Sequence, residues 1–270
     1  MADPIVTDPS KPDTPAKEEG GLWEMVKVIF QALLIALVVR TFLFQPFNIP
    51  TGSLIPTLLI GDYLFVSKYA YGYSKHSFPF SIAPFEGRVL GSRPKRGDIV
   101  VFKLPRDNST DYIKRLIGLP GDKVQMVEGR LRINGQIVPR EPAAQPVISK
   151  NRYGRPEPMP TYVETLPGDA PGAPPTRHLI IESEGDTGFA DNTRVFEVPP
   201  GHYFFMGDNR DNSTDSRIPA SESGVGFVPE DNLVGRGEMI FFSIEEDAAA
   251  WQVWNWPWTV RWSRIFQRVK

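Results

Sequence analysis

The sequence predicts a mainly β protein in which an N-terminal transmembrane helix is followed by an antiparallel β-sheet or barrel-like domain with a smaller inserted β subdomain. One long apolar run lies near the N-terminus, and no segment of comparable helical periodicity follows residue 60. Short runs of β-branched and aromatic residues, bounded by Gly, Pro, Asn or Asp, recur through the rest of the chain. Such runs without intervening helices favour an antiparallel sandwich or barrel.

Composition excludes several classes of protein and site. With 270 residues, of which 41% are hydrophobic and 23% charged, the chain has the composition of a folded protein. A formal net charge of −2 lacks the basic signature of nucleic-acid binding. The absence of cysteine excludes a thiol nucleophile, a cysteine-based metal site and any disulfide. The three histidines are dispersed, so a histidine-rich metal site is not expected.

The N-terminal region divides into a tail and an anchor. Residues 1–21 are rich in Pro, Asp, Lys and Gly and predict a disordered tail. Residues 22–45 predict a transmembrane anchor, because the apolar run would form a helix of about 34 Å, enough to cross a hydrocarbon core of about 30 Å. A cleaved signal peptide is the alternative, but no small-x-small cleavage site follows the run. Near the span, Lys11, Lys17 and Lys27 lie on the N-terminal side and only Arg40 lies on the other, which predicts a cytoplasmic N-terminus and an extracytoplasmic body.

The body divides into a predicted catalytic domain, residues 46–124 and 200–270, and an inserted β subdomain, residues 125–199. Asn134-Gly135 between two short apolar runs predicts a type I′ hairpin. Residues 139–176 contain many prolines and little periodicity, so we expect a loop-rich excursion there. The other predicted strands are residues 97–104, 111–118, 123–128, 194–199, 202–208 and 237–244.

The C-terminus carries an aromatic and basic cluster. Five of the six tryptophans lie between residues 251 and 262, close to three arginines and the C-terminal lysine. Tryptophan and cationic side chains together are typical of a membrane interface. Core tryptophans under a C-terminal cap are an equally open interpretation.

Three serine-based arrangements are available for nucleophilic chemistry. A Ser-His-Asp triad is disfavoured, because no histidine has a recognisable catalytic context and no G-x-S-x-G motif occurs. Ser92 and Lys95 have S-x-x-K spacing, but Pro94 opposes the helical turn that this pair requires. Lys114 lies in a predicted strand, where alternation places it on one face with Tyr112 and Leu116. There it is either a surface lysine on an edge strand or a desolvated amine whose lowered pKa allows it to accept a proton.

The polar segment "GDNRDNSTDSR", residues 207–217, is spelled like a calcium loop but does not fit one. Counted from Asp208, the third ligand position is Arg210, the sixth is Ser213 in place of Gly, and the twelfth is Pro219. The segment therefore needs another explanation.

Four motifs occur in one order after the apolar run: "NIPTGSLIPTLLIGD", "RGDIVVFK", "DYIKRLIGLPGD" and "GDNRDNSTDSR". Together they resemble the bacterial type I signal peptidases, or leader peptidases. The resemblance implies that Ser53 is the nucleophile and Lys114 the general base. It also implies that the Thr51 hydroxyl and the Ser53 N–H form the oxyanion hole.

The last motif carries the implied supporting residues. The resemblance assigns Ser213 to orienting the lysine amine, and it assigns Asp215 and Arg217 to a supporting ion pair. Thr51 stands where the family commonly has Ser, and Leu54 where it commonly has Met. Thr51 keeps the hydroxyl and Leu54 keeps the apolar bulk, so neither departure removes a required group.

The function implied by the resemblance is cleavage of N-terminal signal peptides from exported preproteins by a membrane-anchored serine endopeptidase. The family implies an acyl-enzyme, small residues such as Ala at substrate positions −1 and −3, and no cofactor. Its expected location is the bacterial inner membrane, with the catalytic domain on the periplasmic side, and its expected partners are preproteins and membrane lipid. Two alternatives remain: a self-cleaving Ser-Lys protein of the repressor type, and a non-enzymatic anchored β protein that associates through its Trp-rich end.

Overall fold

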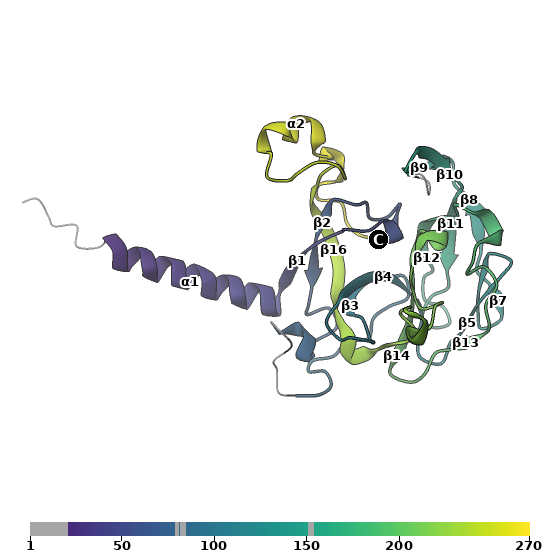
Figure 1. Cartoon of the computed structure of the whole chain (residues 1–270). Coiled ribbons are helices and arrows are strands. Elements are labelled where there is room, and N and C mark those ends of the chain that lie inside the picture. The colour runs from purple at the N-terminus through teal and green to yellow at the C-terminus, as the bar shows by residue number, and fades with distance from the viewer. Residues whose placement is uncertain (1–20, 79–80, 82–84, 151–153) are drawn as a thin grey trace, which may run out of the picture. The chain divides into compact units, whose positions relative to one another are not determined.

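The computed structural model describes residues 21–78, 81, 85–150 and 154–270 (Figure 1). The chain forms two compact units, Met1–Val38 and Val39–Lys270. Helix α1 (Gly21–Phe42) is long and apolar enough to cross a membrane, although a signal sequence near an N-terminus meets the same criterion. All of its residues except Thr41 are exposed. Apart from Glu24, Lys27, Gln31 and Arg40, its side chains are mostly apolar.

The second unit is built on a curled antiparallel sheet of seven strands in the order β1-β2-β16-β3-β4-β14-β15 (Figure 1). Every neighbouring pair is antiparallel. The sheet confirms the mainly β fold predicted from the sequence. Its strands are β1 (Phe44–Asn48), β2 (Asp62–Ser67), β3 (Ile99–Lys103), β4 (Asp111–Gly118), β14 (His202–Met206), β15 (Val228–Pro229) and β16 (Leu233–Ser243).

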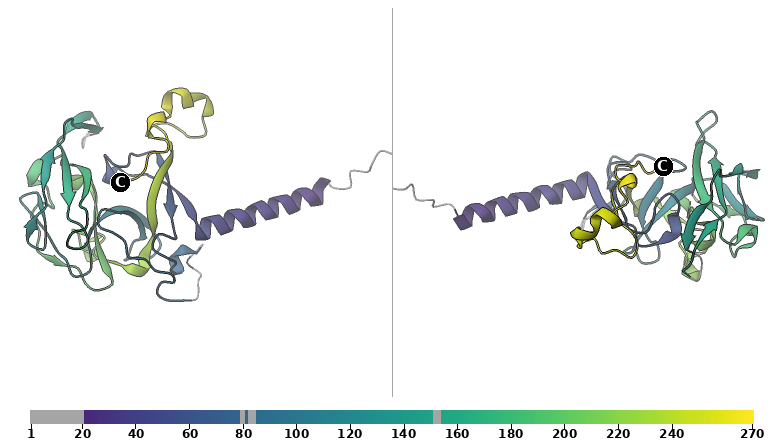
Figure 2. Two further views of the ribbon diagram at one scale, coloured as in Figure 1. Left: turned by 180° about the vertical axis from the view of Figure 1, so that it is seen from behind. Right: turned by 90° about the horizontal axis from the view of Figure 1, so that it is seen from above.

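The chain between β4 and β14 forms three smaller sheets in its described part, with orders β13-β5-β6-β7, β12-β11-β8 and β10-β9. Figure 2 shows these strands, teal to green, gathered on one side of the unit. They are β5 (Lys123–Val127), β6 (Arg130–Ile133), β7 (Gln136–Ile137), β8 (Arg140–Pro142), β9 (Val147–Lys150), β10 (Pro156–Met159), β11 (Thr161–Leu166), β12 (Thr176–Ile181) and β13 (Phe196–Glu197).

The predicted hairpin at Asn134-Gly135 is confirmed. The two residues connect β6 to β7, and Ile133 pairs with Gln136 across the turn. Their φ angles are 53° and 80°, and positive φ at both central positions is what a type I′ turn requires.

The expectation of a loop-rich excursion over residues 139–176 is wrong, because β8, β9, β10 and β11 lie within it. Pro156 and Pro158 belong to β10, which pairs only with β9. A two-stranded sheet leaves each strand with a free edge, where proline is tolerated. In β11 the buried Glu164 interrupts the apolar pattern, and it is matched by Arg210 from a distant loop.

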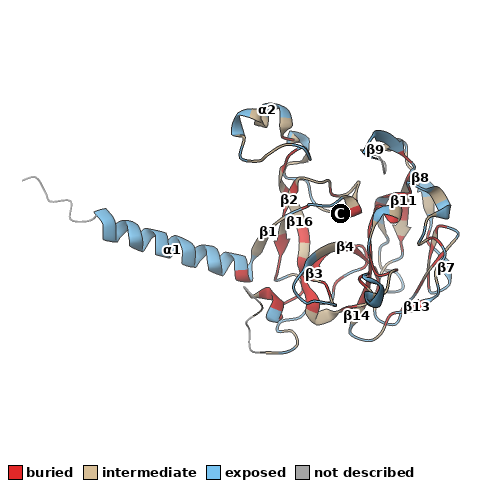
Figure 3. Ribbon diagram, viewed as in Figure 1, coloured by how far each residue is buried: buried red, intermediate tan, exposed pale blue. Residues whose placement is uncertain are grey.

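The core consists of clusters on the faces of the large sheet, and Figure 3 shows the buried residues concentrated in its strands. Phe102 of β3 stacks on Phe205 of β14 with ring centroids 4.7 Å apart, and Leu116 of β4 joins the same cluster. A second cluster joins Leu54 and Leu58 to residues of β2, β3 and β16. Burial of each such leucine contributes about 1.5–3 kcal/mol and fixes the segment around residue 53 against the sheet.

The Trp-rich end lies mostly outside the core, around the short helix α2 (Trp256–Thr259). Trp256 packs against Phe242, with ring centroids 5.1 Å apart, and its indole N–H donates to the Ala250 carbonyl. Four other tryptophans are at least 59% exposed, namely Trp251, Trp254, Trp258 and Trp262. The interpretation of the cluster as core tryptophan is therefore wrong for these four side chains.

Two of the basic side chains in this segment bind within the protein. Arg264 forms an ion pair with the buried Asp62 at 2.6 Å, and Arg261 lies 3.7 Å from the same carboxylate. The Ser243 hydroxyl also donates to Asp62. Asp62 therefore ties the C-terminal segment to the start of β2.

Candidate active site

Ser53 lies in the short 3₁₀ helix η1 (Gly52–Leu54), which the buried Leu54 fastens to the sheet. Asn209 holds this turn from the polar loop after β14. Its backbone N–H donates to the Ser53 carbonyl at 3.1 Å, and its side-chain amide donates to the Gly52 carbonyl at 3.1 Å. The serine backbone is thus fixed from two independent parts of the chain.

Lys114 lies in the middle of β4, and its Nζ is 2.6 Å from Ser53 Oγ although the residues are 61 positions apart in sequence. Both side chains belong to buried residues, with exposed fractions of 4% for Lys114 and 8% for Ser53. The amine also lies 5.4 Å from the Tyr112 ring centroid, as two-residue alternation along β4 predicts. The structure therefore contradicts the interpretation of Lys114 as a surface lysine on an edge strand, because β4 lies between β3 and β14.

The surroundings of Lys114 make its ammonium form less favourable than it is in water. Burial lowers its pKa from 10.5 to about 8, while Asp215 and Asp208 oppose the shift and Arg217 adds to it. A protonated amine donates to Ser53 Oγ, whereas a neutral amine accepts the serine O–H. The pair can consequently transfer a proton over one short contact.

Asp215 and Arg217 form a buried bidentate ion pair. Arg217 Nε donates to Asp215 Oδ1 and one terminal nitrogen donates to Oδ2, each at 2.9 Å. The Gly207 N–H donates to the same carboxylate at 3.0 Å. Burial alone would raise the pKa of Asp215, but Arg217 and the Gly207 N–H outweigh it and leave the pKa below its usual value. Asp215 therefore stays ionised near the lysine.

Ser213 and Thr51 occupy different positions beside the pair. The Ser213 hydroxyl is buried and contributes to lowering the pKa of Asp215, and no hydrogen bond joins it to the lysine amine among the described residues. A Cβ at Gly207 would lie 2.3 Å from Ser213 Oγ and 2.5 Å from the Ser53 carbonyl oxygen, so both groups border this glycine. Thr51 is exposed, and its side chain does not cap η1.

Sequence reasoning did not identify a second buried ion pair next to the lysine. Arg115 Nε and a terminal nitrogen donate to the two oxygens of Asp208, each at 2.7 Å, across 93 residues of sequence. Thr57 also donates to Asp208. The polar turn after β14 and the strand carrying Lys114 were both recognised, but nothing local in either indicates that Asp208 pairs with Arg115.

Among the described residues, three carboxylates lie close enough together to be considered as metal ligands. Glu182, Asp191 and Asp211 each bring an oxygen within 4.8 Å of the others. Burial raises the pKa of Glu182 to about 8, so this group keeps its proton at neutral pH. A protonated carboxyl is a poor cation ligand, and we assign no cation to the cluster.

The chain resembles known proteins over most of its length. The family model described as signal peptidase, peptidase S26, matches residues 22–242. A signal peptidase I of Rickettsia conorii is 40% identical over 246 residues, which cover 88% of this chain and 84% of that protein. A signal peptidase I of Rickettsia canadensis is 42% identical over 212 residues, covering 77% and 76%. A crystal structure of a signal peptidase I from Enterococcus faecalis is 29% identical, covers 54% of this chain and 97% of that chain, and has a TM-score of 0.30.

The burial of Lys114 predicts a pH-dependent gain in stability when the amine is removed. Because the pKa falls from 10.5 to about 8, the protonated lysine costs the folded state about 3 kcal/mol. We expect Lys114→Met to raise the free energy of unfolding by about this amount below pH 8, and the gain to vanish as pH rises towards 10.5. Urea denaturation of the full chain in detergent, followed by tryptophan fluorescence, measures both quantities.

Lys75→Met is the matched control, because Lys75 is exposed. Its effect on the free energy of unfolding should not change across this pH range. A constant difference between Lys114→Met and the unaltered protein from pH 7 to 10.5 would contradict the desolvation argument.

Proposed function

The chain belongs to the signal peptidase family, peptidase S26, and from this premise we propose that it cleaves signal peptides from preproteins with Ser53 as nucleophile and Lys114 as general base. The observation that supports these roles best is the distance of 2.6 Å between Lys114 Nζ and Ser53 Oγ in a buried setting. Family membership makes the chain an enzyme, so the non-enzymatic alternative fails. The repressor-type alternative loses its basis as well, since the match begins in the apolar helix.

The proposed reaction proceeds through an acyl-enzyme. Neutral Lys114 accepts the Ser53 proton as Oγ bonds to the carbonyl carbon at the cleavage site. The carbon–nitrogen bond then breaks, and the lysine ammonium returns its proton to the leaving amine. A water molecule, deprotonated by the same amine, attacks the ester, and Ser53 regains its proton.

Charge that develops on the carbonyl oxygen requires hydrogen-bond donors. We assign this role to the Ser53 N–H and to the Thr51 hydroxyl, whose residue lies exposed two positions earlier. In this proposal, Ser213, Asp215 and Arg217 position the amine. Ser213 would do so through its buried hydroxyl, and the ion pair by holding the loop beside Gly207.

We also propose a domain division and a substrate preference that the sequence predicts. They comprise a catalytic domain of residues 46–124 and 200–270, an inserted subdomain of residues 125–199, and a preference for small residues at substrate positions −1 and −3. A substrate bound as an added strand would present alternate side chains to such pockets.

We also propose that α1, within residues 22–45, anchors the chain in the bacterial inner membrane. The tail, residues 1–21, would be cytoplasmic and the body periplasmic, following the lysine distribution. The four exposed tryptophans near α2 would add a second lipid contact, because indole rings favour the headgroup region. Both contacts would keep Ser53 near the membrane surface, where a signal peptide presents its cleavage site.

The Ser53 and Lys114 assignment predicts loss of activity in three variants. Ser53→Ala, Lys114→Ala and Lys114→Arg should abolish processing of a preprotein in detergent, the last because a guanidinium stays protonated. Thr51→Ala should reduce kcat by about 10²–10³-fold through loss of one oxyanion donor. Thr51→Ser keeps the hydroxyl and serves as the active control. Near-normal turnover by any of the first three variants would exclude the proposed pair.

The lowered pKa of Lys114 predicts the pH profile. The amine must be deprotonated to act as a base, so kcat/KM should rise with pH through about 8. Initial rates on a peptide substrate from pH 5 to 11 give the midpoint. A rising limb centred near the ordinary lysine value of about 10.4 would show that the base is not desolvated.

The lipid contact of the Trp-rich end is testable without α1. A chain that begins at Val39, where the second compact unit begins, should sediment with vesicles containing anionic lipid. Combined Trp254→Ala, Trp258→Ala and Trp262→Ala should lower the fraction that sediments. Phe189→Ala, at a side chain 87% exposed elsewhere on the unit, is the control and should not change sedimentation. Equal sedimentation of the triple variant would refute the lipid role.

A further inference from the structure

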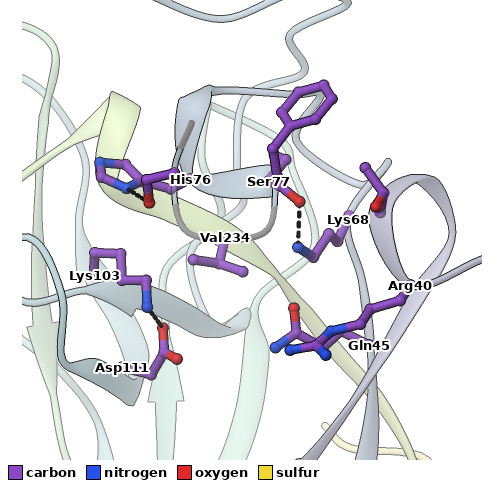
Figure 4. Close-up of a pocket in the computed structure, with 11 residues that line it drawn as sticks. Arg40, Gln45, Lys68, His76, Ser77, Lys103, Asp111 and Val234 are labelled. Atoms are coloured by element: carbon purple, nitrogen blue, oxygen red, sulfur yellow. Dashed lines mark hydrogen bonds and ion pairs between the residues drawn. The ribbon is translucent and has the colours of Figure 1, made fainter. Parts of the chain in front are cut away.

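A polar cavity of about 120 Å³ lies within the second compact unit and contains no residue of the proposed catalytic site (Figure 4). This volume is well above the ~10–15 Å³ needed to hold one water molecule. The last turn of α1, η2 (Lys75–Ser77) and strands of the large sheet line it. The lining side chains used below are Arg40, Lys68, His76, Lys103 and Asp111.

The cavity contains more positive than negative charge. Lys103 forms an ion pair with Asp111 at 2.9 Å, which neutralises one cation. Figure 4 shows this pair on one side of Val234, and Lys68 and Arg40 on the other. Neither Lys68 nor Arg40 has a carboxylate within ion-pair distance among the residues that the structure describes. The lining therefore has two uncompensated cations.

Lys68 is the unusual group, because it is buried and no described carboxylate lies within ion-pair distance of its amine. Its residue is 3% exposed, and its amine makes one hydrogen bond, to the Ser77 carbonyl at 2.6 Å. An ammonium has three donors, so two remain unused. Burial, followed by repulsion from Arg40, lowers the pKa of Lys68 to about 8. Buried charges in proteins are normally paired, so this amine lacks the partner expected for it.

A second buried group lacks a partner on the same lining. His76 is 5% exposed, its Nδ1 lies 3.0 Å from the Ser81 hydroxyl, and its Nε2 has no hydrogen-bond partner in the described chain. If Nδ1 accepts from Ser81, Nε2–H is a further unused donor. The unsatisfied groups are thus mostly donors, which an anion with several oxygens would satisfy.

We propose that this cavity binds the phosphate of an anionic phospholipid headgroup. A phosphate diester offers oxygens both to the forked guanidinium of Arg40 and to the ammonium of Lys68. Phosphate esters also occur free in solution, but Arg40 and Thr41 belong to the last turn of the apolar helix α1. Cationic side chains at the end of such a helix meet anionic headgroups. This choice of lipid as the source rests on the proposed anchoring of α1.

Binding of this kind would add a specific lipid contact to the large sheet. Lys68 directly follows β2, and Lys103 ends β3, the neighbour of the strand that carries Lys114. A headgroup in the cavity would therefore hold the sheet bearing the Ser53 and Lys114 pair at the level of the lipid phosphates.

The test compares two lipids with identical acyl chains. The full chain in detergent is titrated with dioleoylphosphatidylglycerol or with dioleoylglycerol, which lacks the phosphate, and native mass spectrometry counts the lipids retained. We expect one phosphatidylglycerol to bind at least tenfold more tightly than dioleoylglycerol. Arg40→Gln and Lys68→Gln should each weaken that site about tenfold. Equal retention of the two lipids, or unchanged binding by both variants, would overturn the proposal.

Three controls separate this result from other effects. Lys75→Gln removes an exposed lysine that does not line the cavity and should leave binding unchanged. Arg40 is exposed, so Arg40→Gln decides the outcome should Lys68→Gln fail to fold. Ser53→Ala should bind phosphatidylglycerol like the unaltered chain, which keeps the result independent of proteolysis.

Inorganic phosphate distinguishes the two sources of the ligand. Millimolar phosphate that displaces one phosphatidylglycerol from the full chain, but not from Arg40→Gln, would support recognition of a lipid phosphate. Binding of inorganic phosphate without any preference for phosphatidylglycerol over dioleoylglycerol would assign the cavity to a soluble anion and refute the lipid source.

Discussion

The proposed chemistry depends on one amine that is kept out of water. In that proposal Lys114 accepts a proton near neutral pH because β4 lies inside the large sheet, where burial disfavours the ammonium. The neighbouring strands supply the desolvation, and the cluster around Leu54 presses η1 against the same sheet. Desolvation of the amine and placement of the serine are therefore results of one packing arrangement.

The two carboxylates near Lys114 raise its pKa only to a limited extent, because arginines pair with both of them. Asp215 and Asp208 both favour the protonated amine, but each is engaged in a bidentate ion pair, with Arg217 and Arg115 respectively. Lys68 reaches a similarly lowered pKa with a cation rather than a carboxylate as its main charged neighbour. A similar lowering of the lysine pKa is thus found at a candidate base beside a hydroxyl and at a candidate anion site.

Features that depend on short stretches of chain were predictable. Asn134-Gly135 specifies its turn because both residues tolerate positive φ, and the apolar run specifies α1 by its length and composition. Strands such as β3 and β4 followed from β-branched runs between turn residues. The strands within residues 139–176 were not predicted, because prolines at a sheet edge and the buried Glu164 interrupt the usual pattern of a strand. It also left open the Trp-rich end, since exposure depends on what packs around it.

The sequence by itself determined the fold class, the family resemblance and the identities of the candidate residues Ser53 and Lys114. Tertiary structure alone decided that these two groups lie 2.6 Å apart, that Asn209 clamps the serine turn, and that Arg115 pairs with Asp208 across 93 residues. It also decided that Lys68 is buried with no carboxylate at ion-pair distance in the described part of the chain. Turn and strand preferences depend on residues that are neighbours in the sequence, so the sequence is enough to predict them. Desolvation and ion pairing depend on the groups that surround a side chain in space. Those surroundings form only when strands that are distant in the sequence pack together.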